Sequence, residues 1–268
     1  MSIKLIAVDM DGTFLSDAKT YNRPRFLAQY QRMREQNIRF VVASGNQYYQ
    51  LISFFPEIAH QIAFVAENGG WVVSGNEDVF NCQLPVHHFN AVVDHLQTLP
   101  NIEIIACGKR SAYTLNRYND ALKTVAAKYY HRLELVDDFN HLDDTILKFG
   151  LNVPDSLIPE IQPKLHAALG DMVTAVATGY GSIDLIIPGV HKANGLRILQ
   201  QRWGIEDHEV VAFGDNDIEM LQHAGFGFAM ANAREDVKAV ARYQAPHNNE
   251  EGVLQIIDKV LDREAPFA

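Results

Sequence analysis

The 268-residue sequence has little cysteine and no long hydrophobic run. Its only cysteines, Cys82 and Cys107, belong to no paired-cysteine motif, and the eleven histidines form no cluster with them at ligand spacing, which argues against a structural zinc site. No segment approaches the ~20 uninterrupted apolar residues that span a bilayer. Lys4 and Asp9 interrupt the first apolar run, unlike in a signal peptide. We therefore expect a cytoplasmic protein without a membrane partner.

Basic residues are also scarce relative to acidic ones. The chain has 23 Lys and Arg against 33 Asp and Glu, which gives a formal net charge of -10. This balance argues against nucleic acid as a partner, and no feature indicates a protein partner. An anionic small substrate remains compatible with it, because a metal ion or a lysine can reverse the field at one site.

In the first 81 residues, apolar runs typical of buried strands alternate with helical patterns. Runs at 3–8, 38–43 and 62–66 predict strands, and patterns at 22–36 and 48–55 predict the helices between them. This βαβαβ order predicts an α/β fold with a parallel, Rossmann-like sheet and helices on both faces. The same texture returns after Pro188, with predicted helices at 193–203, 218–223, 234–241 and 253–261 and strands at 209–213 and 227–230.

The middle of the chain has a different pattern. Turns rather than helices separate several of its strands, which predicts an antiparallel sheet with helices on one face. We therefore assign residues 1–81 plus 186–268 to one domain and 82–185 to an inserted α+β domain. The glycine-bearing segments 107–109 and 179–181 are interpreted as turns of this insertion. Its predicted helices are 88–98, 118–128 and 156–168, and its predicted strands are 102–106, 112–115, 133–136, 146–153, 172–177 and 183–187.

Polar, reactive side chains stand at the carboxyl ends of three predicted parallel strands. Strands of one parallel sheet end on the same side, so these groups should converge on one crevice. Carboxylates from two strands suit Mg²⁺, which takes oxygen ligands and keeps waters that a phosphate can displace. The groups are Asp9 and Asp11, Ser44 and Gly45, and Asp215 and Asp217.

Lys192 and the helix predicted after Ser44 add positive potential to the same crevice. A lysine is a point charge suited to phosphate, and the first amides of a helix attract anions. A carboxylate ~4 Å from a phosphate charge repels it by roughly 4 kcal/mol at an effective dielectric near 20, so Asp9 needs both Mg²⁺ and Lys192 to approach phosphorus. Asp9 could then attack it to form an aspartyl-phosphate. Asp11 could protonate the leaving alkoxide and later deprotonate the attacking water.

These residues resemble the motifs of the haloacid dehalogenase superfamily. Asp9-Met10-Asp11-Gly12-Thr13 matches its Asp-x-Asp-Gly-Thr signature, Ser44-Gly45-Asn46 fits the second motif, and Lys192 fits the third. The whole chain resembles the Cof-like subgroup, in which a cap occupies the place of residues 82–185. Segments such as 41–51 resemble the sugar phosphatases of that subgroup.

The resemblance implies a Mg²⁺-dependent phosphatase that acts on small phosphate esters, most readily sugar phosphates. It implies Asp9 as nucleophile and metal ligand, Asp11 as general acid/base and as a ligand through its backbone carbonyl, and Asp215 as the third ligand. It further assigns Asp217 to a supporting position behind the ligands. The residues assigned to phosphate or substrate are Met10, Ser44, Gly45, Lys192 and Asn216.

The fourth motif departs from the family pattern. The family has Gly-Asp-x-x-Asn-Asp, whereas here Gly214-Asp215 runs directly into Asn216-Asp217, either as a true deletion or because two residues are missing from the sequence as written. Two residues correspond to up to ~7 Å of chain reach. We keep Asp215 as a metal ligand, because it directly follows its strand, and expect Asn216 and Asp217 to be displaced.

Other functions and plain structural roles stay open. A phosphomutase or phosphotransferase would use the same aspartyl-phosphate, a signalling receiver is also phosphorylated on Asp, and a non-catalytic relative fits the shortened motif. Among the remaining polar residues, Glu67-Asn68-Gly69-Gly70 is interpreted as a hairpin turn. Asn232 is predicted to cap the helix at 234–241, and Asn248-Asn249 is predicted to be a loop.

Overall fold

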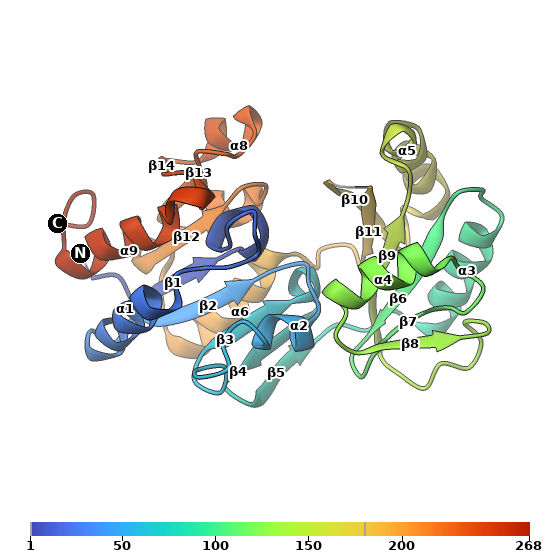
Figure 1. The fold of residues 1–268 in the computed structure, drawn as a ribbon, viewed down its shortest axis with the longest axis horizontal. Coiled ribbons are helices and arrows are strands. Elements are labelled where there is room, and N and C mark those ends of the chain that lie inside the picture. The colour runs from blue at the N-terminus through green and yellow to red at the C-terminus, as the bar shows by residue number, and fades with distance from the viewer. Residues whose placement is uncertain (1, 180) are drawn as a thin grey trace.

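Two β-sheets organise the structure, and the strands of the second are inserted between strands of the first (Figure 1). The computed structural model describes residues 2–179 and 181–268, so Tyr180 of the predicted turn 179–181 lies outside the described residues. We call β1–β5, β12–β14 and their helices the core unit, and β6–β11 with α3–α5 the inserted unit. Within the described ranges, no helix is both long and apolar enough to cross a membrane.

The core unit is built on an eight-stranded sheet in the order β14-β13-β12-β1-β2-β3-β4-β5. Six strands are parallel, and β4 and β5 are added antiparallel through hairpins, as the Asn-Gly-Gly turn predicts. Side chains alternate between the two faces, so α1, α2 and α9 pack on one face and α6, α7 and α8 on the other. The elements are β1 (Leu5–Val8), α1 (Arg23–Glu35), β2 (Arg39–Ala43), α2 (Tyr48–Ile52), β3 (Ala63–Ala66), β4 (Trp71–Ser74), β5 (Glu77–Asn81), α6 (Lys192–Trp203), β12 (Val210–Gly214), α7 (Ile218–His223), β13 (Phe226–Met230), α8 (Glu235–Val240), β14 (Tyr243–Ala245) and α9 (Gly252–Asp262).

The inserted unit is built on a six-stranded sheet in the order β10-β11-β9-β6-β7-β8. The sequence-based expectation of a purely antiparallel sheet is wrong at one pair, because α4 crosses over between β7 and β8 and makes them parallel. The expectation of helices on one face is also wrong, since α3 and α5 cover one face and α4 the other. The elements are α3 (Val86–Gln97), β6 (Glu103–Gly108), β7 (Ala112–Leu115), α4 (Asp120–Tyr129), β8 (Leu133–Val136), β9 (Ile146–Asn152), α5 (Ile158–Leu169), β10 (Thr174–Gly179) and β11 (Ser182–Ile186).

Two strands of the core sheet were not predicted from the sequence. They are β5 and β14, which form its two edges. Edge strands in natural proteins are commonly short and polar, which limits pairing with other chains. The segment of β5 reads Glu-Asp-Val-Phe-Asn and β14 has only three residues, so neither carries the apolar run of a central strand.

Candidate active site

The position of β1 in the core sheet brings the predicted site residues together. It lies between β2 and β12, with Val8 aligned to Val42 on one side and to Phe213 on the other. Asp9 follows β1 directly, and its backbone N–H donates to the carbonyl of Phe213 at 3.1 Å. The ends of β1, β2 and β12 therefore lie side by side, as the prediction of a single crevice requires.

The loop after β1 forms one tight turn over Met10–Phe14, and Gly12 makes this turn possible. Gly12 has a φ of +72°, and a Cβ there would lie 2.5 Å from Oδ2 of Asp215. Only glycine combines this conformation with this close approach. The Thr13 hydroxyl donates to Oδ1 of Asp215 at 3.1 Å, so the loop also holds the carboxylate.

Asn232 stabilises the loop after β1 through hydrogen bonds. Its side-chain amide donates to the carbonyl of Gly12 at 2.8 Å, and its Oδ1 accepts from the backbone N–H of Asn248 at 3.0 Å. The prediction that Asn232 caps the following helix is wrong, because the capping residue of α8 is Arg234. Asn248 lies in a short 3₁₀ turn and donates to the carbonyl of Leu15, so both asparagines hold the loop after β1.

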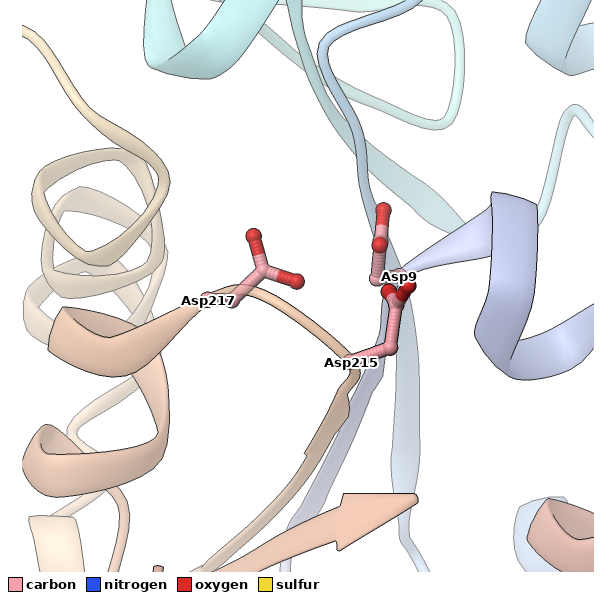
Figure 2. A group of neighbouring side chains, drawn as sticks. All are labelled: Asp9, Asp215 and Asp217. Atoms are coloured by element: carbon pink, nitrogen blue, oxygen red, sulfur yellow. The ribbon is translucent and has the colours of Figure 1, made fainter. Parts of the chain in front are cut away.

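Three carboxylates and one lysine form a cluster beyond the ends of β1 and β12. Asp9, Asp215 and Asp217 each offer an oxygen, and these atoms all lie within 4.8 Å of one another (Figure 2). Lys192, the first residue of α6, contacts Oδ1 of Asp9 at 3.0 Å and Oδ1 of Asp217 at 2.5 Å. Asp9 is 5% and Asp217 8% exposed, so solvent screens these charges poorly.

The crowding of negative charge changes the protonation of the cluster. Burial, followed by the charge of Asp9, raises the pKa of Asp215 to about 7 and holds the pKa of Asp217 well above its usual range. Burial alone would lower the pKa of Lys192, but Asp217 and Asp9 together outweigh it and raise that pKa. Lys192 is therefore a permanent cation, whereas the three carboxylates still lack full compensation.

The donor set of the cluster fits a hard divalent cation. All its groups are carboxylate oxygens, and Oδ2 of Asp217 is a buried atom with no hydrogen-bond partner among the described residues. Ions such as Mg²⁺ take oxygen ligands of this kind. Asp11 does not bring its side chain into the cluster, because its two carboxylate oxygens accept from Lys19 at 2.8 Å and from Asn46 at 2.9 Å.

The loop after β2 lies beside Asp11. Ser44 is buried, and its Oγ accepts the backbone N–H of Asn46 at 3.0 Å. The helix predicted at 48–55 begins at Tyr48 as expected, but α2 has only five residues and follows Gln47 as its capping residue, so its first amides do not adjoin Ser44. Any attraction of this loop for an anion therefore comes from its own backbone and hydroxyl groups.

The other residues predicted for the site differ in burial and in contacts. Met10 is the first residue of the turn after β1, and its side chain is fully buried. The expected displacement of Asp217 is wrong, because the shortened loop still brings its carboxylate to Lys192. Asn216 is exposed, and in residues 2–179 and 181–268 its side chain has no hydrogen-bond partner. The assignment of Asn216 to phosphate therefore stays a prediction.

Comparison with known proteins identifies the family. A family model described as haloacid dehalogenase-like hydrolase matches residues 6–257. The chain belongs to the haloacid dehalogenase-like hydrolases. The predicted family and the predicted α/β fold class are therefore confirmed.

Full-length relatives of this hydrolase include two curated phosphatases. It is 70% identical over 269 aligned positions to the 5-amino-6-(5-phospho-D-ribitylamino)uracil phosphatase YbjI of Escherichia coli strain K12, with 100% of this chain and 99% of the relative covered. It is 28% identical to YitU of Bacillus subtilis strain 168, a phosphatase of the same substrate name, with 94% and 96% covered. A crystal structure of a Streptococcus mutans UA159 protein superposes with a TM-score of 0.93 at 35% identity, covering 97% of this chain and 100% of that one.

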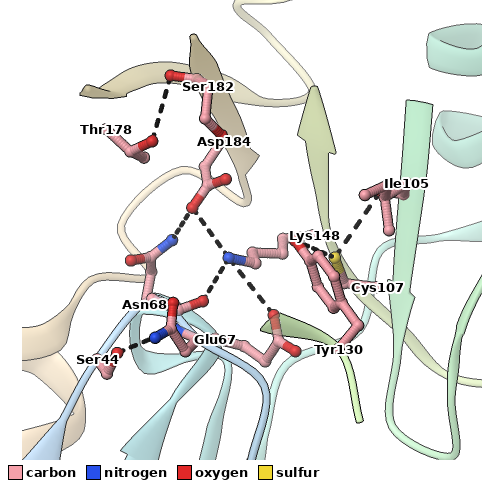
Figure 3. A network of polar contacts seen from close by, with 12 residues as sticks. Ser44, Glu67, Asn68, Ile105, Cys107, Tyr130, Lys148, Thr178, Ser182 and Asp184 are labelled. Carbon is pink, nitrogen blue, oxygen red and sulfur yellow. Dashed lines mark hydrogen bonds and ion pairs between the residues drawn. The ribbon is translucent and has the colours of Figure 1, made fainter. Parts of the chain in front are cut away.

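The hydrolase also contains a buried polar network that the motifs did not reveal (Figure 3). Lys148 of β9 is 2% exposed and lies 2.9 Å from Oδ2 of Asp184 on β11 and 3.5 Å from Oε2 of Glu67. Asn68 donates to the same oxygen of Asp184 at 2.7 Å. Glu67 and Asn68 belong to the hairpin turn between β3 and β4, so the network joins the two units. Its sequence signal is a single charged residue inside each of two apolar strand patterns, at Lys148 and Asp184.

Replacement of Glu67 by glutamine tests the charge balance of this network. Burial raises the pKa of Glu67 to about 7, although Lys148 acts in the opposite direction and Asp184 adds to the increase. An unfolded glutamate has a pKa of about 4.3, so the folded state binds the extra proton between the two pKa values, and this group's contribution to stability falls as pH rises from one to the other. We expect Glu67→Gln to exceed the wild type in unfolding free energy by about 1–3 kcal/mol at pH 8.

The measurement is chemical denaturation of both proteins at pH 5 and pH 8. The advantage of Glu67→Gln should shrink at pH 5, where wild-type Glu67 is already protonated. The exposed Glu219 on α7 provides the control, and Glu219→Gln should show no such pH dependence. An advantage that is larger at pH 5 than at pH 8 would contradict this account.

Proposed function

We propose that this hydrolase is a Mg²⁺-dependent phosphatase of sugar and sugar-alcohol phosphates that acts through an aspartyl-phosphate on Asp9. The reaction class, hydrolysis of phosphoric monoesters, follows from the family together with the 70% identical phosphatase. The name of that relative's substrate describes a phosphate on a ribityl chain, which is a sugar alcohol. Its substrate is therefore the first ester to test.

The observation that carries the proposal is the contact between Asp9 and Lys192 at the centre of the carboxylate cluster. The 3.0 Å contact aligns the Asp9 carboxylate beside a permanent cation, and the loop after β1 fixes its backbone. A carboxylate oxygen of Asp9 attacks phosphorus, and the bond from phosphorus to the ester oxygen breaks. Lys192 offsets the repulsion between the incoming phosphate and the carboxylates.

Asp11 is suited to the proton transfers of the same reaction. Its side chain is turned away from the carboxylate cluster and contacts Asn46, next to the predicted phosphate residues Ser44 and Gly45. In this role it gives a proton to the departing alkoxide and then takes one from the water that cleaves the aspartyl-phosphate. The separate positions of the Asp9 and Asp11 side chains support two separate roles.

Mg²⁺ would be held by the carboxylates of Asp9 and Asp215, and by the backbone carbonyl of Asp11 as the family resemblance implies. When bound, it would supply positive charge that neutralises the phosphate oxygens. Asp217 supports the site by fixing Lys192. We further propose that residues 82–185 act as a cap that selects the substrate and excludes water, and that the protein works in the cytoplasm.

The decisive experiment measures release of inorganic phosphate from a panel of sugar, sugar-alcohol, pyridoxal and nucleotide phosphates. We expect hydrolysis of sugar or sugar-alcohol phosphates that disappears with EDTA and returns with added Mg²⁺. Phosphoryl transfer to a second sugar without release of phosphate would instead establish a phosphotransferase or mutase. A folded protein that turns over none of the esters with Mg²⁺ would overturn the proposal.

Replacement of Gly12 by alanine should disable the site with little change elsewhere. The new Cβ would lie 2.5 Å from Oδ2 of Asp215 and would force both the loop and the carboxylate to move. A misplacement of this kind in a catalytic group costs about 100-fold in rate, and we expect at least that loss of turnover.

Gly204 offers a matched control for this variant. It has a similar φ of +64°, but a Cβ there meets no atom within 4 Å. Both substitutions carry the left-handed backbone penalty of about 1–2 kcal/mol, which thermal unfolding would register. Only Gly12→Ala should lose phosphate release, and equal activity in the two variants would contradict the role given to Gly12.

A further inference from the structure

The peptide unit between Gly45 and Asn46 is held at both ends. Its carbonyl accepts from Nζ of Lys148 at 2.6 Å, and its N–H donates to Oγ of Ser44 at 3.0 Å. Lys148 comes from β9 of the inserted unit, whereas the loop belongs to the core unit. The orientation of this peptide plane therefore depends on a cation supplied by the other unit.

The same loop touches two residues of the proposed chemistry. The hydrogen bond from Asn46 N–H engages a lone pair of the Ser44 hydroxyl and so fixes the direction in which that hydroxyl can donate. The side chain of Asn46 donates to Oδ2 of Asp11 at 2.9 Å. A rotation of the Gly45–Asn46 peptide would displace both groups.

Lys148 is itself fixed in place by surrounding groups. It is 2% exposed, lies 2.9 Å from Asp184 and 3.5 Å from Glu67, and so has opposite charges around it. A buried cation of this kind is tolerated only when its geometry and its partners are well defined. Asp184 also accepts from Asn68, and Figure 3 shows these groups converging on the lysine ammonium.

The hairpin turn at Glu67 and Asn68 has an unusual backbone conformation and packs against residues 44–46. Glu67 has a φ of +53°, which a residue with a long side chain rarely adopts unless surrounding contacts impose it, and Asn68 follows with a φ of +58°, which asparagine tolerates better. Asn68 N–H donates to the carbonyl of Ser44 at 3.1 Å, and Glu67 N–H donates to that of Asn46 at 3.2 Å. The turn and Lys148 thus both form hydrogen bonds with residues 44–46.

We propose that Lys148 is a positioning residue for phosphate binding, through which docking of the inserted unit orients Ser44 and the Asn46–Asp11 contact. This inference rests on the proposed phosphatase function for its ligand. Lys148 does not touch the reacting atoms. It acts through the Gly45 carbonyl, so the phosphate loop has its working geometry only when the inserted unit is in place.

The test compares three variants with the wild type. Lys148→Met removes the cation. Lys148→Met/Asp184→Asn removes the cation together with one buried carboxylate, which keeps the network closer to neutral and preserves folding. Lys109→Met is the matched control, because Lys109 also joins the inserted unit to the core, through Asp78 and through Asn81 at 3.2 Å, without touching residues 44–46.

Three readouts separate positioning from general stabilisation. Calorimetry with Mg²⁺ measures the affinity for inorganic phosphate, steady-state kinetics separates kcat from KM, and hydrogen exchange reports the backbone of residues 44–46. In the folded Lys148 variants we expect about tenfold or greater weakening of phosphate binding, a higher KM, and faster exchange at 44–46. Lys109→Met should leave all three close to wild-type values.

The outcomes decide the proposal independently of the catalytic function. Wild-type affinity and exchange in the folded double variant would overturn it, and so would equal losses in the Lys109 and Lys148 variants, which would show general docking only. If the wild type hydrolyses no ester, the proposed function fails, but exchange at residues 44–46 still decides the role of Lys148.

Discussion

Replacing Asp9 by asparagine is expected to abolish phosphate release, with a loss of at least about 10⁴-fold in turnover, as is typical when a catalytic nucleophile is removed. The amide cannot donate an electron pair to phosphorus as the carboxylate does, and it cannot form an aspartyl-phosphate. The remaining groups still bind phosphate, since Lys192 and the loop after β2 are unchanged.

The same substitution should leave the fold intact. Asp9 is one of three crowded carboxylates, and its charge contributes to the raised pKa of Asp215 and of Asp217. Removing that charge relieves repulsion in the metal-free protein, while the asparagine carbonyl can still accept from Lys192. We therefore expect a melting temperature at or above that of the wild type in EDTA.

Phosphate release and thermal unfolding in EDTA are the two measurements for this variant. The control is Asp94→Asn, which makes the same chemical change at an exposed position on α3. Appreciable turnover by Asp9→Asn would remove Asp9 as the nucleophile. A collapse of the fold would show instead that its main role is structural.

Replacing Lys192 by methionine is expected to damage both activity and stability. Lys192 contacts Asp9 and Asp217 and, in the part of the chain that the structure describes, is the only basic side chain paired with a carboxylate of the cluster. Removing one partner of a buried ion pair costs about 3–5 kcal/mol, because the other charges stay buried without compensation. Turnover should fall by about 10³-fold, the scale of losing a preorganised group that stabilises charge.

Added Mg²⁺ should reverse most of the stability loss of Lys192→Met. Mg²⁺ supplies positive charge to the same carboxylates, so we expect saturating Mg²⁺ to restore most of the melting temperature of Lys192→Met but little of its activity. Lys164 on α5 forms an exposed pair with Glu160 and is the control, since such pairs contribute little to stability. A variant that is unaffected in EDTA would contradict the assigned charge balance.

The centre of the site could be predicted from the sequence because its geometry follows from topology. Apolar runs that end in Asp9, Ser44 and Asp215 predict strand ends, and parallel pairing places such ends at one edge. No contact between distant side chains had to be known. Gly12 fits the same logic, because a turn directly after a strand demands a residue that tolerates positive φ.

The other features of the site depend on contacts between side chains that the spacing of residues in the sequence does not reveal. Lys148 and Asp184 read as isolated charges in apolar strands until the two units dock and bring Glu67 and Asn68 to them. Chain reach along the backbone predicts a displaced Asp217, because it takes no account of side-chain contacts. In the structure Asn216 is exposed, and the Asp217 side chain contacts Lys192.

The central position of β1 also sets the order in which the molecule can assemble during synthesis. The inserted unit is a contiguous segment, so all its strands are synthesised before β12. The Thr13–Asp215 hydrogen bond, by contrast, joins residues 202 positions apart. We expect a released, truncated chain ending after Trp203 to protect the amides of β6–β11 from exchange, while β1 remains an unpaired edge beside the missing β12. The proposed catalytic centre can thus be completed only after the inserted unit has been synthesised.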